Sequence, residues 1–515
     1  MASAPLCSSP PPLLSPRPQL LHCSVCKRQL QLQNAHSLQR QIQLSSMWYP
    51  SGEQIALWNE TNNVLHQLSP LNSPSLRSLA RMVTDRLASP PQQITIISIA
   101  ESPLVAEAAS ALGCHVLQLS PVEASGPWLA CATLQALASS AAASEGALLV
   151  GYVFKHARAL ALEAQAMLPL LPADGVCFAP LDLSRCLEDQ AACNLLLHKL
   201  TDALDPNEGS GRVPALNAAA HLFLEHAAAA ASQQAGASDG GGASRPLPVL
   251  LDPWPAVAQV LDRVALARVL DRACLAARKA GVPVRTPVWT ALDAFDAAAS
   301  SAALATAGVR LPCIVKPRAA CGVPEAHHMA FVLCAEGFGG LDVPLPAVAQ
   351  EYVDHGGCVW KAYVAGGRVF SARRRSTPDL APLARLLAAD PDAGVPAAID
   401  FDSLRSLPTL LPWTQRAQKA GGSGGGRGSD AAPVPELLQH PHTLEAVAAA
   451  LRQELGLTLF GFDVVFDAPA GELVVIDLNY LPSYKDVPEA PAALRAALRA
   501  AAAERATAPA NNASS

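Results

Sequence analysis

The sequence has no excess of positive charge. Its 37 lysines and arginines are outnumbered by 43 aspartates and glutamates, which gives a formal net charge of -6 and a pI near 6.1. A protein whose main partner is a nucleic acid usually carries a basic field. We therefore expect no nucleic-acid partner. At 515 residues the chain is long enough for about two to four domains with a substantial core.

The sequence also lacks paired cysteine motifs. Its 13 cysteines are scattered, and the only close pair is Cys23 with Cys26. A zinc ribbon needs a second such pair, and a redox CxxC motif needs a strand-to-helix setting. The pattern favours free, buried thiols in a reducing compartment.

No segment has the character of a membrane span. The longest stretch without charge, Ala124 to Ser144, is long enough to cross a bilayer but contains Pro127, Gln135 and several serines. Alanine is barely apolar on insertion scales. We interpret the stretch as an alanine-rich helix outside the membrane.

Residues 1–50 contain no aspartate or glutamate and are rich in Ser, Pro, Leu and Gln, with basic residues Arg17, Lys27, Arg28 and Arg40. This composition is typical of an organellar transit peptide, and equally of a disordered tail. We expect a cytoplasmic protein with a disordered leader, with import into a plastid or mitochondrion as the alternative.

Several common catalytic signatures are missing. There is no GxSxG or HExxH motif, so serine hydrolase and zinc protease chemistry have no basis in the sequence. The glycine-rich runs at 231–245 and 417–431 lack the preceding strand and following helix of a phosphate loop. Their composition predicts flexible linkers.

Alternating apolar segments predict an α/β protein. QQITIISIA and CHVLQLS are strand patterns, with a helix pattern between them that ends at Gly113. We assign residues 51–145 to an accessory α/β segment of unknown role. ALLVGYVF, VCFAPLD and NLLLHKL predict three strands of a second α/β domain at 146–245, with a helix around Ala157 to Met167. A larger domain would follow at 246–500, and 501–515 would be a disordered tail.

The most informative segment lies near the C-terminus. TLFGFDVVFD and LVVIDLNYLP predict two strands joined by a loop that contains Gly471. Because side chains two apart share a strand face, Asp477 and Asn479 point the same way, and Asp463 can lie beside them. Two carboxylates and an amide oxygen are ligands suited to Mg²⁺. The alternative is an ordinary polar face of an amphipathic hairpin.

Cations accompany this hairpin. Lys316 ends the apolar strand LPCIVKPR, where an unpaired ammonium is unfavourable, so a phosphate partner is one explanation and a side chain that reaches water is the other. Lys361 and then Arg373 to Arg375 follow on later strands. A run of cations facing an acidic pair suggests a polyanion site.

Eight segments within residues 147–495 resemble, in order, the motifs of the inositol-tetrakisphosphate 1-kinases (inositol 1,3,4-trisphosphate 5/6-kinases). They are LVGYVFKHARAL, LLHKLTD, LDPWPAVAQVLDR, LPCIVKPR, HHMAFV, QEYVDHGGCVWKAYVAG, RRRSTPDL, and the hairpin LFGFDVVFD with VIDLNYLPSY. The resemblance implies an α/β (α+β) protein with an ATP-grasp fold, preceded by a small α/β domain.

The resemblance also implies roles for individual residues. Candidate ATP contacts are Arg263, Lys316, Gln350, Glu351, Tyr352, Val353, Lys361 and Ser376. Candidate Mg²⁺ ligands are Asp463, Asp477 and Asn479. Candidate inositol-phosphate contacts are Arg158, His327, Lys361, Asn479 and Ser483, and the candidate catalytic residues are Lys316, Lys361 and His327. The family resemblance favours a monomer.

Three positions depart from the family pattern. Arg158 stands where the family typically has Lys, which keeps the charge but alters reach and hydrogen-bond geometry. Ser483 replaces a glycine in the turn LPSY, where we expect either a changed turn or a compensating hydroxyl contact. His328 stands where an acid is common, which would add positive charge to the substrate pocket below neutral pH.

The expected activity is Mg²⁺-dependent transfer of the γ-phosphate of ATP to a hydroxyl of a soluble inositol polyphosphate. Such transfer depends mainly on alignment and charge neutralisation, so no dedicated base is required. His327 or Lys361 would steady the developing charge. The alternatives are a carboxylate-amine ligase with the same nucleotide site, and a non-catalytic protein that binds inositol phosphates or nucleotides.

Overall fold

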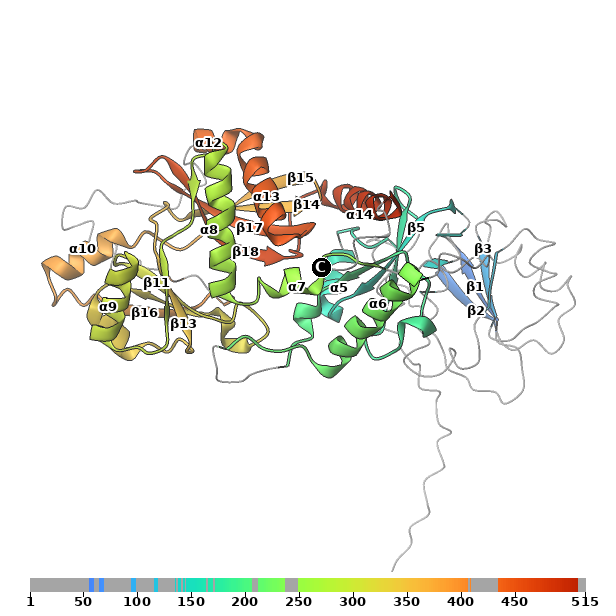
Figure 1. Cartoon of the computed structure of the whole chain (residues 1–515), viewed down its shortest axis with the longest axis horizontal. Coiled ribbons are helices and arrows are strands. Elements are labelled where there is room, and N and C mark those ends of the chain that lie inside the picture. The colour runs from blue at the N-terminus through green and yellow to red at the C-terminus, as the bar shows by residue number, and fades with distance from the viewer. Residues whose placement is uncertain are drawn as a thin grey trace, which may run out of the picture. The chain divides into compact units, whose positions relative to one another are not determined.

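The computed structural model describes four strands and a few further residues before residue 145, and most of residues 145–507, with gaps at 164, 170–171, 206–211, 237–248, 406–407 and 409–433. The chain divides into two compact units, Met1–Ser140 and Ala141–Ser515. Figure 1 shows the described helices and strands.

The first unit contains one described sheet. Its strands are β1 (Ile55–Asn59), β2 (Val64–Leu68), β3 (Ile94–Ser98) and β4 (His115–Gln118), in the order β2-β1-β3-β4. The predicted strands QQITIISIA and CHVLQLS are confirmed as β3 and β4, which pair in parallel. Strands β1 and β2 were not predicted. The helix expected between β3 and β4 lies outside the described residues.

The second unit begins with a small parallel sheet of order β6-β5-β7-β8. Its strands are β5 (Leu148–Val153), β6 (Val176–Pro180), β7 (Leu195–His198) and β8 (Val249–Leu250). Nearly every residue of β5, β6 and β7 is buried, as expected for parallel strands, which read as continuous apolar runs. The three predicted strands are confirmed, and the predicted helix is α5 (His156–Glu163).

One linker prediction needs correction. Helix α6 spans Ala218–Gly236 and therefore includes the first residues of the predicted linker at 231–245. The segment AAAAASQQAG is rich in alanine, the strongest helix former, so the helix continues although the composition becomes polar. The rest of that linker and the whole run at 417–431 lie outside the described residues.

A five-stranded antiparallel sheet follows, with order β10-β13-β11-β12-β16. Its strands are β10 (Trp289–Leu292), β11 (Cys313–Pro317), β12 (His328–Val332), β13 (Ala347–Glu351) and β16 (Ala398–Asp402). Helices α9 (Ala297–Ala307) and α10 (Ala381–Ala389) belong to the same region. Leu304 of α9 and Leu383 of α10 pack in its cores. Strands β11 and β12 confirm two predictions.

The second five-stranded sheet has the order β15-β14-β17-β18-β9. Its strands are β9 (Val284–Arg285), β14 (Cys358–Ala365), β15 (Arg368–Arg375), β17 (Leu459–Asp467) and β18 (Glu472–Tyr480). Helices α7 (Trp254–Ala258), α8 (Arg263–Lys279), α12 (Glu436–Gln439), α13 (Pro441–Leu455) and α14 (Ala490–Thr507) complete the unit. The predicted hairpin is confirmed as β17 and β18.

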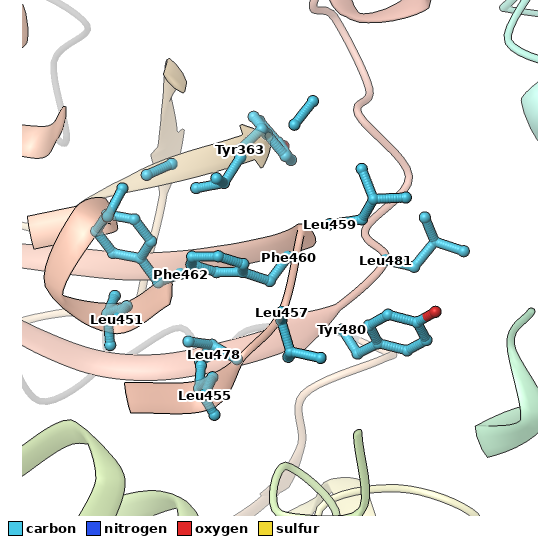
Figure 2. Packing of buried hydrophobic residues seen from close by; sticks show 14 of the residues in the cluster. Tyr363, Leu451, Leu455, Leu457, Leu459, Phe460, Phe462, Leu478, Tyr480 and Leu481 are labelled. Atoms are coloured by element: carbon cyan, nitrogen blue, oxygen red, sulfur yellow. The ribbon is translucent and has the colours of Figure 1, made fainter. Parts of the chain in front are cut away.

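The main core lies against one face of this second sheet. Phe460 and Phe462 of β17, Leu478 of β18 and Leu451 of α13 are fully or almost fully buried and pack together (Figure 2). Helix α8 contributes Leu266, Val269 and Leu270 to the same cluster and packs beside α13 (Figure 1). The opposite face of the hairpin carries a smaller apolar cluster, in which Val465 and Val474 pack with Val359 of β14, and it also carries Asp463 and Asp477.

Predictions for the first fifty residues, for Cys23 and Cys26, and for most of Ala124 to Ser144 fall outside the described residues. None of the helices that the structure describes is long and apolar enough to cross a membrane.

Candidate active site

The acidic pair of the site sits on the hairpin of β17 and β18. Asp463 and Asp477 are direct cross-strand partners, so their side chains leave the same face of the sheet. A register shift follows immediately after Asp463, where Val464 pairs with Val475 and Ile476 becomes the extra residue. This bulge puts Val475 into the core although it lies two residues from Asp477.

Asn479 lies two pairs further along the hairpin, opposite Gly461. It is exposed and shares its strand face with Asp477. A Cβ at position 461 would approach the Ala362 carbonyl to 3.0 Å, so glycine lets β17 run close to β14 at this point. The structure thus brings the three predicted oxygen donors together.

Lys361 of β14 completes this face. Its ammonium donates to Asp463 Oδ2 at 2.6 Å. Burial alone would lower the pKa of Lys361, but the charge and hydrogen bond of Asp463 outweigh burial and raise it. Burial raises the pKa of Asp463, the charge of Lys361 opposes that shift, and the charge of Asp477 adds to it. The two acids therefore repel each other and are stabilised by nearby cations.

Lys316, at the end of β11, faces the same acids from the other sheet. Burial lowers the pKa of its ammonium to about 8, the nearby Asp477 and Asp463 favour the charged form, and Arg263 disfavours it. The prediction that Lys316 needs an anionic partner agrees with this environment. An ammonium binds phosphate oxygens as a point charge, and a nucleotide phosphate as the partner of Lys316 stays a prediction.

Arg263 lies at the start of α8 and supports the loop that follows β11. Its guanidinium donates to the carbonyls of Pro317 and Ala319 at 2.6 Å each and to the Ala326 carbonyl at 3.1 Å. The preceding residue, Asp262, caps α8 and accepts hydrogen bonds from Arg318. These contacts show that Arg263 shapes the 317–326 loop, and its predicted contact with an ATP phosphate stays a prediction.

His327 follows this loop. Its Nδ1 lies 3.2 Å from the Ser403 hydroxyl. Burial lowers the pKa of His327, and the charge of Arg263 lowers it further. The imidazole is therefore neutral near pH 7, and its role as a phosphate contact would depend on a hydrogen bond rather than on charge. His328 Nε2 lies 3.9 Å from Asp402 Oδ2.

The predicted adenine hinge, Gln350 to Val353, starts at the end of β13. The Tyr352 hydroxyl donates to the carbonyl of Pro378, in the segment that follows β15, at 2.6 Å. Ser376 lies beside the hinge, with its hydroxyl 2.9 Å from His355 Nε2. His355 Nδ1 lies 2.7 Å from the Val353 carbonyl, which can only accept. His355 therefore donates from Nδ1 and, when neutral, accepts from Ser376.

The predicted substrate residue Arg158 lies on α5 of the small α/β domain. Its Nε donates to Asp202 Oδ2 at 3.2 Å, and its Nη1 donates to the Leu481 carbonyl at 3.4 Å. Arg158 thus contacts the LPSY turn directly after the strand of Asp477 and Asn479. The structure places it next to the end of the acidic hairpin, as a substrate contact beyond Asn479 would require.

The backbone at Ser483 is not in the left-handed region that favours glycine. Positive φ angles occur at Leu481 (41°) and Tyr484 (49°) and not at Ser483. A serine at this position therefore carries none of the strain of a left-handed residue. The strain lies on its neighbours, and the Tyr484 hydroxyl anchors the turn by donating to the Val364 carbonyl at 2.7 Å. Ser483 is exposed.

Comparison with known proteins identifies the family of the chain. The family model of the inositol 1,3,4-trisphosphate 5/6-kinase ATP-grasp domain matches residues 281–387 and 429–498. Inositol-tetrakisphosphate 1-kinase 1 of Zea mays is 30% identical over 318 residues, which cover 61% of this chain and 77% of the maize protein. The chain belongs to the inositol-tetrakisphosphate 1-kinase family.

Other relatives match at different coverage. Inositol-tetrakisphosphate 1-kinase 6 of Oryza sativa subsp. indica is 30% identical over 366 residues, which cover 67% of this chain. The chain spans 58% of the length of that rice protein. A D-alanine–D-alanine ligase from Bacillus anthracis aligns at 13% identity and a TM-score of 0.37, covering 70% of this chain and 98% of that chain.

Family membership identifies the two five-stranded sheets as the ATP-grasp fold, and confirms the predicted fold class. The matched ranges include the acidic hairpin, Lys316, His327, the hinge, Lys361 and Ser376. Arg158 and Arg263 lie before the matched ranges, so their assignment depends on their positions in the structure and on the sequence motifs.

Sequence reasoning missed one buried cation of this inositol-phosphate kinase homologue. Lys199, directly after β7, donates to the Tyr480 carbonyl and lies 5.0 Å above the Tyr480 ring. Burial lowers the pKa of Lys199 to about 8, and the charge of Arg158 lowers it further. The signal was a lysine at the end of the apolar strand LLLHK, the same signal that singled out Lys316.

Proposed function

We propose that the chain is an ATP-dependent kinase that transfers the γ-phosphate of ATP to a hydroxyl of an inositol polyphosphate, as inositol 1,3,4-trisphosphate 5/6-kinases and inositol 3,4,5,6-tetrakisphosphate 1-kinases do. The observation that supports it best is the pairing of Asp463 with Asp477 between Lys361 and Lys316. The two acids lie there between two lysines, one from each five-stranded sheet of the ATP-grasp domain.

The donor set fits a magnesium ion. No cluster of three His, Cys, Asp or Glu side chains is found among the described residues, and the candidate set is instead two carboxylates with the Asn479 amide. Hard oxygen ligands of this number suit Mg²⁺, which completes its coordination with phosphates and water. A bound Mg²⁺ would neutralise charge on the nucleotide phosphates.

The residues of the chain would align the reactants. Lys316 would hold the phosphate tail of ATP, and the loop that Arg263 organises would lie beside it. The hinge from Gln350 to Val353 would receive adenine, with Ser376 as a further nucleotide contact. This alignment supplies most of the rate enhancement expected for phosphoryl transfer between bound substrates.

The acceptor would bind at the end of the hairpin. Arg158 and Lys361 would pair with phosphates of the inositol ring, and neutral His327 would contribute a hydrogen bond. Asn479 and Ser483 flank Leu481 along the chain, and the Leu481 carbonyl accepts from the Arg158 guanidinium. Lys361 is also a candidate ATP contact and, with His327 and Lys316, a candidate catalytic residue.

The test is a product analysis. Purified protein would be incubated with ATP, Mg²⁺ and a panel of inositol phosphates, and the products resolved by anion-exchange chromatography. A product with one added phosphate supports the proposal. ADP formation that requires an amine and a carboxylate instead of an inositol phosphate would show a ligase, and nucleotide binding without turnover would show a non-catalytic protein.

We propose that the kinase acts in the cytoplasm as a monomer, with plastid or mitochondrial import as the alternative. The described cysteines are free thiols, which suits a reducing compartment. Gel filtration with light scattering tests the monomer. Imaging of the chain with a C-terminal fluorescent protein distinguishes the compartments.

A further inference from the structure

Arg285 lies where the chain passes between the two sheets of the ATP-grasp domain. It ends β9, which belongs to the sheet of the acidic hairpin. Four residues later, Trp289 begins β10, which belongs to the other sheet. The short crossing at 286–288 is fixed from α8, because Asp271 accepts from the Thr286 hydroxyl at 2.5 Å and from the Trp289 indole at 3.0 Å.

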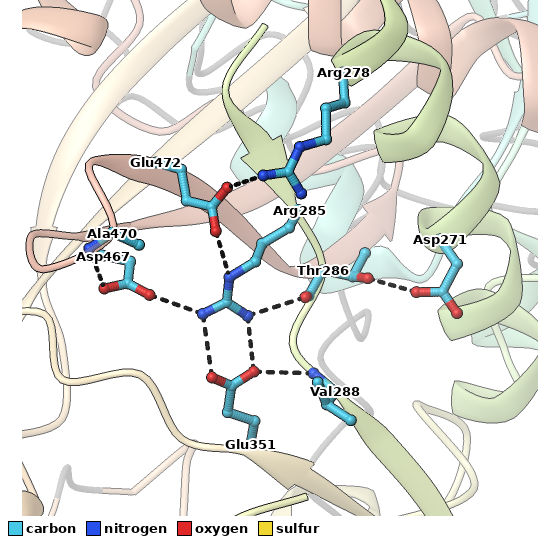
Figure 3. Close-up of polar contacts among 9 residues, drawn as sticks. All are labelled: Asp271, Arg278, Arg285, Thr286, Val288, Glu351, Asp467, Ala470 and Glu472. Atoms are coloured by element: carbon cyan, nitrogen blue, oxygen red, sulfur yellow. Dashed lines mark hydrogen bonds and ion pairs between the residues drawn. The ribbon is translucent and has the colours of Figure 1, made fainter. Parts of the chain in front are cut away.

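The Arg285 guanidinium is surrounded by three carboxylates (Figure 3). Nη1 donates to Glu351 Oε2 at 2.7 Å, and Nη2 donates to Glu351 Oε1 at 3.1 Å. Nη2 also donates to Asp467 Oδ2 at 2.8 Å, and Nε lies 2.9 Å from Glu472 Oε1. Only 20% of the arginine side chain is exposed, so these contacts are shielded from water much more than an ordinary surface pair.

Glu351 connects Arg285 to the hinge. It ends β13, and the chain then crosses back toward β14 through residues 352–357. Its Oε2 also accepts from the Val288 amide at 3.0 Å, and its own amide donates to the Val288 carbonyl at 2.8 Å. The Arg285–Glu351 pair therefore joins two crossings of the chain between the sheets, one of which contains the last two residues of the predicted adenine segment.

Asp467 and Glu472 connect Arg285 to the acidic hairpin. Asp467 ends β17 and Glu472 begins β18, so the two acids flank the turn whose strands carry Asp463 and Asp477. Arg278 of α8 donates to Glu472 at 2.7 Å from the other side. One guanidinium thus touches the hinge and both strands of the hairpin.

We propose that Arg285 is a positioning residue for phosphoryl transfer, which fixes the spacing between the adenine hinge and the hairpin of Asp463 and Asp477 through Glu351, Asp467 and Glu472. The proposal rests on the proposed kinase function for its catalytic consequence. Arg285 itself lies in the polar cluster of Figure 3 and none of its observed partners is a predicted metal ligand.

The chemistry of the cluster explains why arginine is needed. A guanidinium presents donors in a fixed fork, so it can bind Glu351 through two nitrogens while it reaches two further acids. A lysine can satisfy part of this set only. Without any cation, three partly buried carboxylates would repel one another, and the hinge and hairpin would move apart.

The test compares four variants with the wild type: Arg285→Met, Arg285→Lys, Glu351→Gln and the double variant Arg285→Met/Glu351→Gln. The control is Arg272→Met, which removes a more exposed ion pair with Glu454 between α8 and α13 of the same domain. The readouts are kcat, KM for each substrate, the Kd of ATP by calorimetry, and thermal stability.

For Arg285→Met we expect about a tenfold rise in the KM and Kd for ATP and about a tenfold fall in kcat, because small misplacements of reacting groups are costly. The KM for the inositol phosphate should change less than about twofold. Arg285→Lys should be intermediate. The double variant should be no worse than Arg285→Met, since residues that act through one contact are not additive.

Three results would overturn the proposal. One is a loss of thermal stability with kcat and both KM values within twofold of the wild type. Another is a double variant whose loss of activity equals the product of the losses in Arg285→Met and Glu351→Gln. A third is an equal effect of Arg272→Met. If Arg285→Met does not fold, Arg285→Lys and Glu351→Gln decide the matter. A wild type that phosphorylates no inositol phosphate refutes the proposed function, and the Kd values of the variants for ATP then still test the positioning role of Arg285.

Discussion

The acids and lysines of the candidate site lie on strands, whereas His327 ends a short 3-10 helix and Ser483 lies in a turn. The two groups differ in how their positions are determined. Asp463, Asp477 and Lys361 are neighbours because strand register makes them so. Ser483 is placed by contacts distant in sequence, such as the bond from Tyr484 to Val364. The positions of the strand residues therefore follow from register, and those of the other residues depend on anchors elsewhere in the chain.

The largest effect should come from a strand residue. Asp477→Ala should reduce kinase activity by orders of magnitude, because it removes charge neutralisation in the transition state, while circular dichroism and thermal stability stay near wild type. Asp174→Asn, an exposed acid paired with Arg495, is the control and should be fully active. Near-normal turnover of Asp477→Ala would remove the acidic pair from the mechanism.

A second effect concerns His198, which holds Tyr480 directly before the LPSY turn. His198 is fully buried, Nε2 donates to the Asp252 carbonyl at 2.8 Å, and the Tyr480 hydroxyl donates to the His198 carbonyl. Burial lowers the pKa of His198 from 6.5 to about 4. Below pH 6.5 the His198 imidazole binds a proton in the unfolded chain but stays neutral in the folded chain. The free energy of unfolding should therefore fall as the pH drops toward 4, by on the order of 3 kcal/mol.

Urea denaturation at several pH values measures this effect. His198→Gln should show a flatter dependence between pH 6.5 and 4 than the wild type, and the exposed His221→Gln should follow the wild type. If His198→Gln and the wild type lose stability in parallel over that range, His198 is not neutral in the folded state and does not anchor the turn as described.

A smaller effect should follow from loosening the turn itself. Tyr484→Phe removes the hydrogen bond to the Val364 carbonyl and should lower the free energy of unfolding by about 1 to 2 kcal/mol. The control is Tyr363→Phe, a nearby buried tyrosine whose hydroxyl has no hydrogen-bond partner among the described residues. Equal destabilisation by both substitutions would mean that the turn is not held by Tyr484.

The smallest effect concerns Ser483. Because its φ is not positive, glycine would relieve no strain there, and the change should act through the lost hydroxyl. Ser483→Gly should alter the KM for the inositol phosphate by a few-fold and leave the KM for ATP nearly unchanged. An altered KM for ATP, or no change in either constant, would place the acceptor away from the turn.

The same contrast explains what the sequence could predict. Alternation of apolar and polar residues predicted β17 and β18 and the shared face of Asp477 and Asn479. It did not predict the bulge at Ile476, since Asp477 and Val475 have the spacing of a shared face but point to opposite faces. The positive φ angles beside Ser483 were also missed, because tertiary anchors impose them.

The polar cluster around Arg285 could not be predicted from the sequence for a similar reason. Glu351 and Asp467 lie 66 and 182 residues away along the chain, and a single arginine before the short crossing at 286–288 has no local pattern that distinguishes it. In contrast, Lys199 had the same strand-end signal as Lys316 and could have been found. Sequence reasoning works where period and register set the position, and fails where distant contacts do.

The most direct test of a metal-nucleotide site built from strand residues is a crystal structure with ADP and Mn²⁺, read by anomalous scattering. We predict a manganese peak about 2.1 to 2.3 Å from carboxylate oxygens of Asp463 and Asp477, with the nucleotide phosphates on the same ion and the Lys361 ammonium displaced from Asp463. Nucleotide bound with its metal elsewhere, and Lys361 still on Asp463, would contradict it.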